Sequence, residues 1–183
     1  MQEANLALFC LHRLQALLDA ARGGDVEALQ GALAAGADVA ALCSEGHQAL
    51  QLAAEGGHVQ AIFVLIVAGA AVAGARGGPS PLSLAAYKGH LPAVYALLAA
   101  GAVVDCAAMR LAASSGSPGV LGTLLAAGGE TVQESLRDAV HAGSARCVQL
   151  LLEAGLDGEC PSSMHIAAAE GHADIVELLL AHG

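Results

Sequence analysis

The chain has 183 residues, of which 56% are hydrophobic and 2% aromatic, and its formal net charge at pH 7 is -10. This apolar content argues against a disordered chain, and seven Lys and Arg against seventeen Asp and Glu argue against nucleic-acid binding, which needs a basic surface. If the charge attracts a partner, that partner has a basic surface.

The cysteines and the N-terminal segment bear on the compartment. The five cysteines form no C-x-x-C pair, and the segment around Glu3 lacks the basic start of a secretory signal. We therefore expect an intracellular protein in a reducing compartment, the cytoplasm or the nucleus. The cysteines are Cys10, Cys43, Cys106, Cys147 and Cys160.

The first predicted element is a helix over residues 1–18. Leu6, Cys10, Leu14 and Leu17 recur there at helical spacing. Because this stretch is longer than the start of any later unit, we expect it to form an N-terminal capping helix.

From about residue 14 onward the chain repeats one unit. Each unit closes with a leucine-rich stretch and a glycine, and the units end near 36, 69, 101, 128, 155 and 183. Inside each unit a first helix stops at a glycine, which adopts the left-handed conformation at little cost, and a second helix begins at once. Pro92 and Pro118 fall in the first turn of second helices, where a missing N–H costs nothing.

The segment from Ala61 to Ala75 is entirely apolar or glycine and raises the question of a membrane span. It is shorter than the roughly 20 residues that a bilayer requires, and Gly69 and Gly74 interrupt it. We expect a buried helix followed by a turn.

These units resemble ankyrin repeats. The family signature T-P-L-H-x-A is matched by Ser80-Pro81-Leu82-Ser83-Leu84-Ala85 and by Ser162-Ser163-Met164-His165-Ile166-Ala167, and loosely by residues 48–53. The resemblance implies an all-α solenoid of about six helix-turn-helix repeats with short hairpins, forming a single array over residues 1–183.

The chain departs from the family pattern in three places. Repeats four to six are about five residues short where the family has a hairpin tip, so their hairpins are expected to be truncated. Asp138 stands where the family buries a leucine, which predicts a partly solvated weak point at repeats four and five and a gain in stability for Asp138→Leu. The sequence ends at Gly183 without a polar capping helix, so we expect further chain or a partner at that end.

Histidine side chains can serve as metal ligands or catalytic groups, and this chain has eight. Their positions within the repeat instead predict capping and hydrogen bonds between repeats for His58, His90, His165 and His172. Cys147, Cys160 and His165 lack the spacing of a zinc site. The glycine-rich residues 69–78 lack the lysine of a phosphate-binding loop. We expect no metal, no cofactor and no enzymatic activity.

The resemblance implies a binding surface made of the residues that precede each inter-helix glycine, together with the hairpin tips. Tyr87 is the strongest candidate for a binding hot spot, because aromatic side chains dominate binding energy and this chain has few. The predicted partner-binding residues are Glu45, His47, Glu55, Arg76, Tyr87, Lys88, Ser114, Ser115, His141 and Glu170.

The predicted function is therefore a scaffold or adaptor that binds a protein partner through the concave face of the stack. Two alternatives remain at this point: a constitutive structural subunit of a large assembly, and the targeting module of a longer enzyme or ligase subunit. No nucleic acid and no membrane span are expected.

Overall fold

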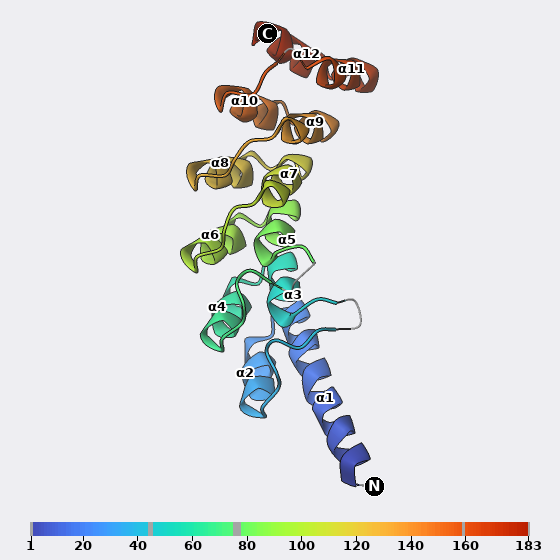
Figure 1. Ribbon diagram of the computed structural model, residues 1–183, viewed down its shortest axis with the longest axis vertical. Helices are drawn as coiled ribbons and strands as arrows, with labels where there is room; N and C mark the ends of the chain where they lie inside the picture. The colour runs from blue at the N-terminus through green and yellow to red at the C-terminus, as the bar shows by residue number, and fades with distance from the viewer. Residues whose placement is uncertain (1, 44–45, 75–77, 159, 183) are drawn as a thin grey trace. The chain divides into compact units, whose positions relative to one another are not determined.

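A computed structural model describes residues 2–43, 46–74, 78–158 and 160–182, and within these ranges the chain forms helices that follow one another in pairs (Figure 1). This confirms the all-α class and the helix-turn-helix units. The helices are α1 (Gln2–Gly23), α2 (Val26–Ala34), α3 (Ala49–Glu55), α4 (Val59–Val67), α5 (Pro81–Tyr87), α6 (Leu91–Ala99), α7 (Cys106–Ser114), α8 (Pro118–Ala126), α9 (Gln133–His141), α10 (Ala145–Glu153), α11 (Pro161–Glu170) and α12 (Ala173–Ala181).

Short-range chemistry explains where several helices begin. The Asp25 carboxylate accepts a hydrogen bond from the backbone N–H of Ala28 at 3.0 Å, and the Asp105 carboxylate accepts one from Ala108 at 2.7 Å. Each bond satisfies a backbone donor that has no partner inside the helix. Pro118 occupies the first turn of α8, as the sequence predicted.

The connectors between helix pairs differ in length as predicted. Residues 35–48 and 68–80 join the early pairs, whereas residues 100–105, 127–132 and 154–160 join the later ones. The longer first connector contains an isolated antiparallel bridge between Leu42 and Gln48, and the described residues form no longer strand. The hairpins of repeats four to six are therefore truncated.

The chain divides into two compact units. The first comprises Met1–Ala85 and Pro92–Ala102, and the second comprises Ala86–Leu91 and Val103–Gly183. The last two residues of α5, Ala86 and Tyr87, thus belong to the second unit.

In the first unit, α1 packs on α2 and α3, and α4 packs on both α2 and α3 (Figure 1). α1 runs without a break from the predicted capping segment into the first repeat, and its N-terminal turns extend beyond α2. Fully buried aliphatic side chains fill the spaces between these helices: Leu17, Leu29, Leu50, Ile62 and Leu65. The apolar segment from Ala61 forms part of α4 and a turn at Gly69, as expected, while Ala75 lies outside the described residues.

A buried amide fastens the second connector to the first unit. Gln51 is fully buried in α3; its side-chain oxygen accepts from the backbone N–H of Gln48 at 2.7 Å, and its side-chain nitrogen donates to the carbonyl of Pro79 at 2.7 Å. A buried polar side chain with both ends satisfied fixes the path of the connector without a desolvation penalty.

In the second unit, α9 packs between α7 and α11, and α10 packs between α8 and α12. Its core is again aliphatic, with Met109, Leu121, Leu124, Leu136 and Leu151 fully buried. First helices therefore pack on first helices and second helices on second helices, which brings the C-terminal ends of α7, α9 and α11 into one neighbourhood.

One of the histidine contacts predicted between repeats is present, and Ser144 makes a second contact of the same kind, which was not predicted. The Nε2 atom of His58 lies 3.0 Å from the carbonyl oxygen of Arg22, and the Ser144 hydroxyl donates to the carbonyl of Gly116 at 3.2 Å. Each side chain follows an inter-helix glycine and reaches back to the turn of the preceding repeat. These contacts stabilise the packing of neighbouring repeats, so we assign His58 and Ser144 a structural role.

Candidate functional site

The predicted partner-binding residues occupy one kind of position in the fold. Glu55, Tyr87, Ser114, His141 and Glu170 are each the last residue of a first helix. The set continues with Lys88 and Ser115, which follow directly in the turns, and His47, which lies in the first connector. Glu45 and Arg76 lie outside the described residues.

Exposure divides this set. Tyr87, Lys88, Ser114, His141 and Glu170 are exposed, whereas Glu55, Ser115 and His47 are partly buried. The Ser115 hydroxyl donates to the carbonyl of Ala112 at 2.8 Å, so it also supports the end of α7. The exposed members are the ones that can be desolvated by a partner.

Tyr87 and Lys88 form a local pair. The Lys88 ammonium lies 5.5 Å from the centre of the Tyr87 ring, within the range of a cation–π interaction. This contact restricts both side chains before any partner binds, which lowers the entropy cost of ordering them.

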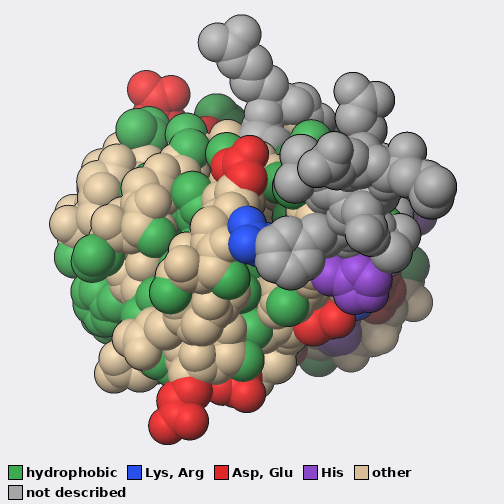
Figure 2. All heavy atoms as spheres, turned by 90° about the horizontal axis from the view of Figure 1, so that it is seen from below, with side chains coloured by type: hydrophobic (Ala, Val, Ile, Leu, Met, Phe, Trp, Pro, Cys, Tyr) green, Lys and Arg blue, Asp and Glu red, His purple; other side chains and the backbone are tan. Residues whose placement is uncertain are grey.

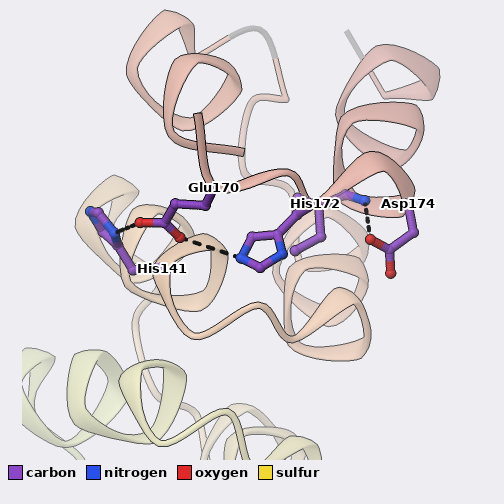
Figure 3. A network of polar contacts seen from close by, with 5 residues as sticks. His141, Glu170, His172 and Asp174 are labelled. Carbon is purple, nitrogen blue, oxygen red and sulfur yellow. Dashed lines mark hydrogen bonds and ion pairs between the residues drawn. The ribbon is translucent and has the colours of Figure 1, made fainter. Parts of the chain in front are cut away.

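His141 and Glu170 are in direct contact. His141 Nδ1 lies 2.7 Å from one carboxylate oxygen of Glu170, and His172 Nε2 lies 3.3 Å from the other (Figure 3). Figure 3 shows the Glu170 carboxylate between the two imidazole rings, while Asp174 accepts from the N–H of Ile175 at 3.0 Å. Sequence reasoning had treated His141 and Glu170 as separate contact residues; the structure joins them across α9 and α11.

An ion pair that the sequence analysis missed links α7 to α9. Arg110 Nε lies 2.9 Å from a carboxylate oxygen of Asp138, and this hydrogen bond, with the attraction of the two charges, raises the pKa of Arg110. The Asp138 side chain is 20% exposed, so it is partly solvated as expected, but it is not unpaired. The ion pair could have been suspected from the sequence, because Arg110 and Asp138 carry opposite charges and lie one repeat apart.

The Arg110–Asp138 pair changes the expected effect of Asp138→Leu. The substitution removes the ion pair and gains only partial burial, so we no longer expect the midpoint of unfolding to rise. In a double-mutant cycle with Arg110→Ala and Asp138→Ala, measured by urea unfolding, the coupling free energy should be about 0.5 kcal/mol in favour of the pair. Additive single effects would show that the two side chains do not interact in solution.

The structure also reveals aromatic side chains outside the predicted surface. Phe63 on α4 is 49% exposed and Tyr95 on α6 is 57% exposed, against 48% for Tyr87. Phe63 and Tyr95 occupy equivalent positions in consecutive second helices. Tyr87 is therefore one of several exposed aromatic residues in the described chain, and Tyr95 provides a matched control for it.

Two cavities flank Leu11 and Leu14 of α1, one of about 430 Å³ next to residues 36–41 and one of about 420 Å³ next to Leu42 and Cys43. Neither is lined by a residue of the predicted surface. Among the described residues, no group of three or more His, Cys, Asp or Glu side chains is arranged to hold a metal ion.

Surface charge and helix hydropathy bear on nucleic-acid and membrane binding. On the face shown in Figure 2, the described Lys and Arg side chains form no continuous stripe, and hydrophobic and uncharged surface predominates. None of the described helices is both long enough and apolar enough to cross a bilayer.

Comparisons with known proteins agree on the architecture. Residues 17–108 match the family model of ankyrin repeats in three copies, and residues 162–183 match the model of a single ankyrin repeat. The crystal structure of the human ASB11 ankyrin repeat domain superimposes with a TM-score of 0.82 at 28% sequence identity, over 91% of this chain and 83% of that chain. No curated protein sequence matches significantly. Because 440 chains of solved structure match, the shared fold does not by itself identify a partner.

Proposed function

We propose that this chain, which belongs to the ankyrin-repeat family, is an adaptor whose partner lies across the C-terminal ends of its first helices. Ankyrin repeats are generally protein–protein interaction modules and are typically not enzymes. In this proposal the contact residues are the exposed members of the predicted set.

The single observation that carries the proposal is that four of the five predicted contact residues at the ends of first helices are exposed: Tyr87, Ser114, His141 and Glu170. His141 and Glu170 also contact each other between repeats, whereas the exposed ring of Tyr87 packs in no core. Tyr87 supplies the apolar contact area, and the Lys88 ammonium above its ring adds a polar contact at the same point.

The net charge favours a partner that is basic overall. The chain as a whole carries a formal charge of -10, while the proposed surface itself carries both the Glu170 carboxylate and the Lys88 ammonium. Complementary charge accelerates association and discriminates against acidic partners, even where it adds little affinity.

The test is affinity capture with three versions of the full chain, read out by quantitative mass spectrometry. One bait variant changes the proposed surface at the end of α5, Tyr87→Ala with Lys88→Glu. The control variant changes two second helices, Gln60→Ala with Glu177→Ala. Partner proteins should be retained by the native chain and the control and lost from the Tyr87/Lys88 variant, with all three baits showing equal unfolding midpoints. Loss from the control alone would assign binding to the second helices.

A constitutive subunit of a larger assembly is the second candidate, and one observation favours it. Phe63, Val67 and Tyr95 leave large apolar side chains exposed on second helices. A subunit that requires other chains should self-associate when expressed alone, whereas an adaptor should be monodisperse; light scattering of the purified chain distinguishes the two.

A further inference from the structure

A cluster of three titratable side chains lies where the last two helix pairs of the second unit meet. His141 ends α9, Glu170 ends α11, and His172 is the N-cap residue of α12. Each oxygen of the Glu170 carboxylate faces one imidazole, with His141 Nδ1 at 2.7 Å and His172 Nε2 at 3.3 Å (Figure 3). The carboxylate therefore connects the end of α9 to the turn between α11 and α12.

The imidazole of His172 also packs against the preceding repeat. A Cβ atom added to Gly143 would lie 2.9 Å from Cε1 of His172, so the ring lies against the turn between α9 and α10. His58 packs in the same way on Gly24 and is likewise the N-cap residue of a second helix. The acceptor differs, because His58 Nε2 faces the neutral carbonyl of Arg22 at 3.0 Å, whereas His172 Nε2 faces a carboxylate.

The carboxylate is particular to the last repeat. Glu170 directly precedes Gly171, whose φ is 79°. The residues that precede the corresponding positive-φ glycines of the other repeats carry no negative charge; they are Gly23, Gly56, Lys88, Ser115 and Ala142. The repeat pattern alone therefore does not account for a carboxylate between two imidazoles.

Protonation of the imidazoles changes the strength of these contacts. A carboxylate only accepts hydrogen bonds, and a neutral imidazole donates from one ring nitrogen at a time, so its tautomer must match the contact. An imidazolium donates from both nitrogens and adds the attraction of opposite charges. Histidine side chains ordinarily change charge between pH 5 and 8, which is the range in which such contacts become ion pairs.

The nearest charged side chains on the surrounding helices have partners of their own. Arg110 of α7 lies 2.9 Å from Asp138 of α9, and Arg146 of α10 donates to Gln149 at 2.8 Å. Asp174 of α12 accepts from the backbone N–H that follows it and points away from the cluster (Figure 3). These groups are therefore engaged outside the cluster.

The other ionisable side chains of these helices supply little net charge at the cluster. Arg137 and Asp138 lie one turn before His141 on α9, and their charges have opposite sign. Among these residue types only histidine ordinarily changes charge between pH 5.5 and 7.5. The remaining ionisable residues of α7 and α9–α12 are Cys106, Glu134, Cys147, Glu153, His165 and Glu177.

Two further titratable groups lie at the far ends of α11 and α12. The Ser162 hydroxyl lowers the pKa of Cys160, the N-cap residue of α11, to about 6. His182 follows α12, and its Nδ1 atom lies 3.0 Å from the carbonyl oxygen of Leu178. Both groups are kept in every variant below, so their protonation cancels when two variants are compared at the same pH.

We propose that His141, Glu170 and His172 form a pH-sensitive clasp, which fastens the last helix pair to the one before it when the imidazoles are protonated. The ion pairs exist only in the protonated state, so their contribution to stability is present at pH 5.5 and is lost as the pH rises through the range in which histidine titrates. The side chains are 54%, 37% and 29% exposed, so water screens the charges and the effect is moderate. This inference concerns the free chain and does not depend on the proposed partner surface.

Hydrogen exchange of the full chain, without a partner, tests the clasp through the protection of the backbone N–H groups of α12. Protection factors are measured at pH 5.5 and 7.5 and corrected for the intrinsic pH dependence of exchange. The compared variant is Glu170→Gln, which keeps an acceptor and removes the charge. The ratio of protection in the native chain to that in Glu170→Gln should be roughly two- to fivefold larger at pH 5.5 than at pH 7.5.

Two more variants complete the test. His141→Gln with His172→Gln retains N–H donors that do not titrate, so it should show the same pH-dependent loss as Glu170→Gln. His165→Gln removes an exposed histidine of α11 outside the cluster, and its ratio to the native chain should be the same at both pH values. A ratio that does not change with pH, for Glu170→Gln or for the folded double histidine variant, would overturn the proposal.

Discussion

Tyr87→Ala is expected to weaken partner binding about thirtyfold, which corresponds to about 2 kcal/mol. The side chain ends α5 and is 48% exposed, so a partner that covers it removes a large apolar area from water. Truncation also removes the ring that lies against the Lys88 ammonium. Isothermal titration of a captured partner with the native and variant chains measures the loss directly.

Tyr95→Ala is the matched control for Tyr87→Ala. Tyr95 has a similar exposure, at 57%, but lies on the second helix α6. Its truncation should change affinity by less than about threefold, since it lies outside the proposed surface. If Tyr95→Ala causes the larger loss while both variants keep the native unfolding midpoint, the partner binds the second helices.

Gly24→Ala is expected to lower the free energy of unfolding by about 2–3 kcal/mol. Gly24 has a φ of 71°, which costs an L-residue roughly 1–2 kcal/mol. A Cβ atom there would also lie 2.5 Å from Nδ1 of His58, so the imidazole would have to move and lose its contact with the Arg22 carbonyl. That lost hydrogen bond adds about 1 kcal/mol.

Gly101→Ala separates the two contributions. Gly101 has a φ of 87°, but a Cβ atom at this position meets no heavy atom within 4 Å. It should therefore cost only the backbone strain, about 1–2 kcal/mol, when both variants are unfolded in urea. Equal losses for Gly24→Ala and Gly101→Ala would mean that His58 does not hold the first two repeats together.

Much of the fold could be predicted because each unit is specified locally. Asp25 and Asp105 initiate helices through their own carboxylates, and the glycines after each helix are tolerated where φ is positive. The shortened connectors could be predicted from the intervals between units. Each of these features depends on residues close together in the sequence.

The contacts between repeats were harder to predict, because they depend on the register of one helix against the next. Asp138 lies one repeat after its partner Arg110, and spacing alone does not show whether the two side chains converge. The same holds for His141 and Glu170, whose positions before inter-helix glycines suggested contacts with a partner, whereas the structure shows that their side chains contact each other.

Exposure was the other quantity that the sequence left open. Phe63 and Tyr95 lie in apolar second helices, where aromatic residues are usually buried, yet both remain about half exposed. Small alanine residues of the same helices, such as Ala61 and Ala93, are fully buried instead. Only the structure shows that the rings of Phe63 and Tyr95 are not needed to fill the core of these helices.

Hydrogen exchange of the chain with and without its captured partner tests the central claim most directly. If the partner lies across the ends of the first helices, backbone protection should rise at residues 86–89, 114–116, 141–143 and 170–172, and the second helices α4, α6, α8, α10 and α12 should exchange as in the free chain. Protection confined to those second helices, with no change at the ends of α5, α7, α9 and α11, would contradict it.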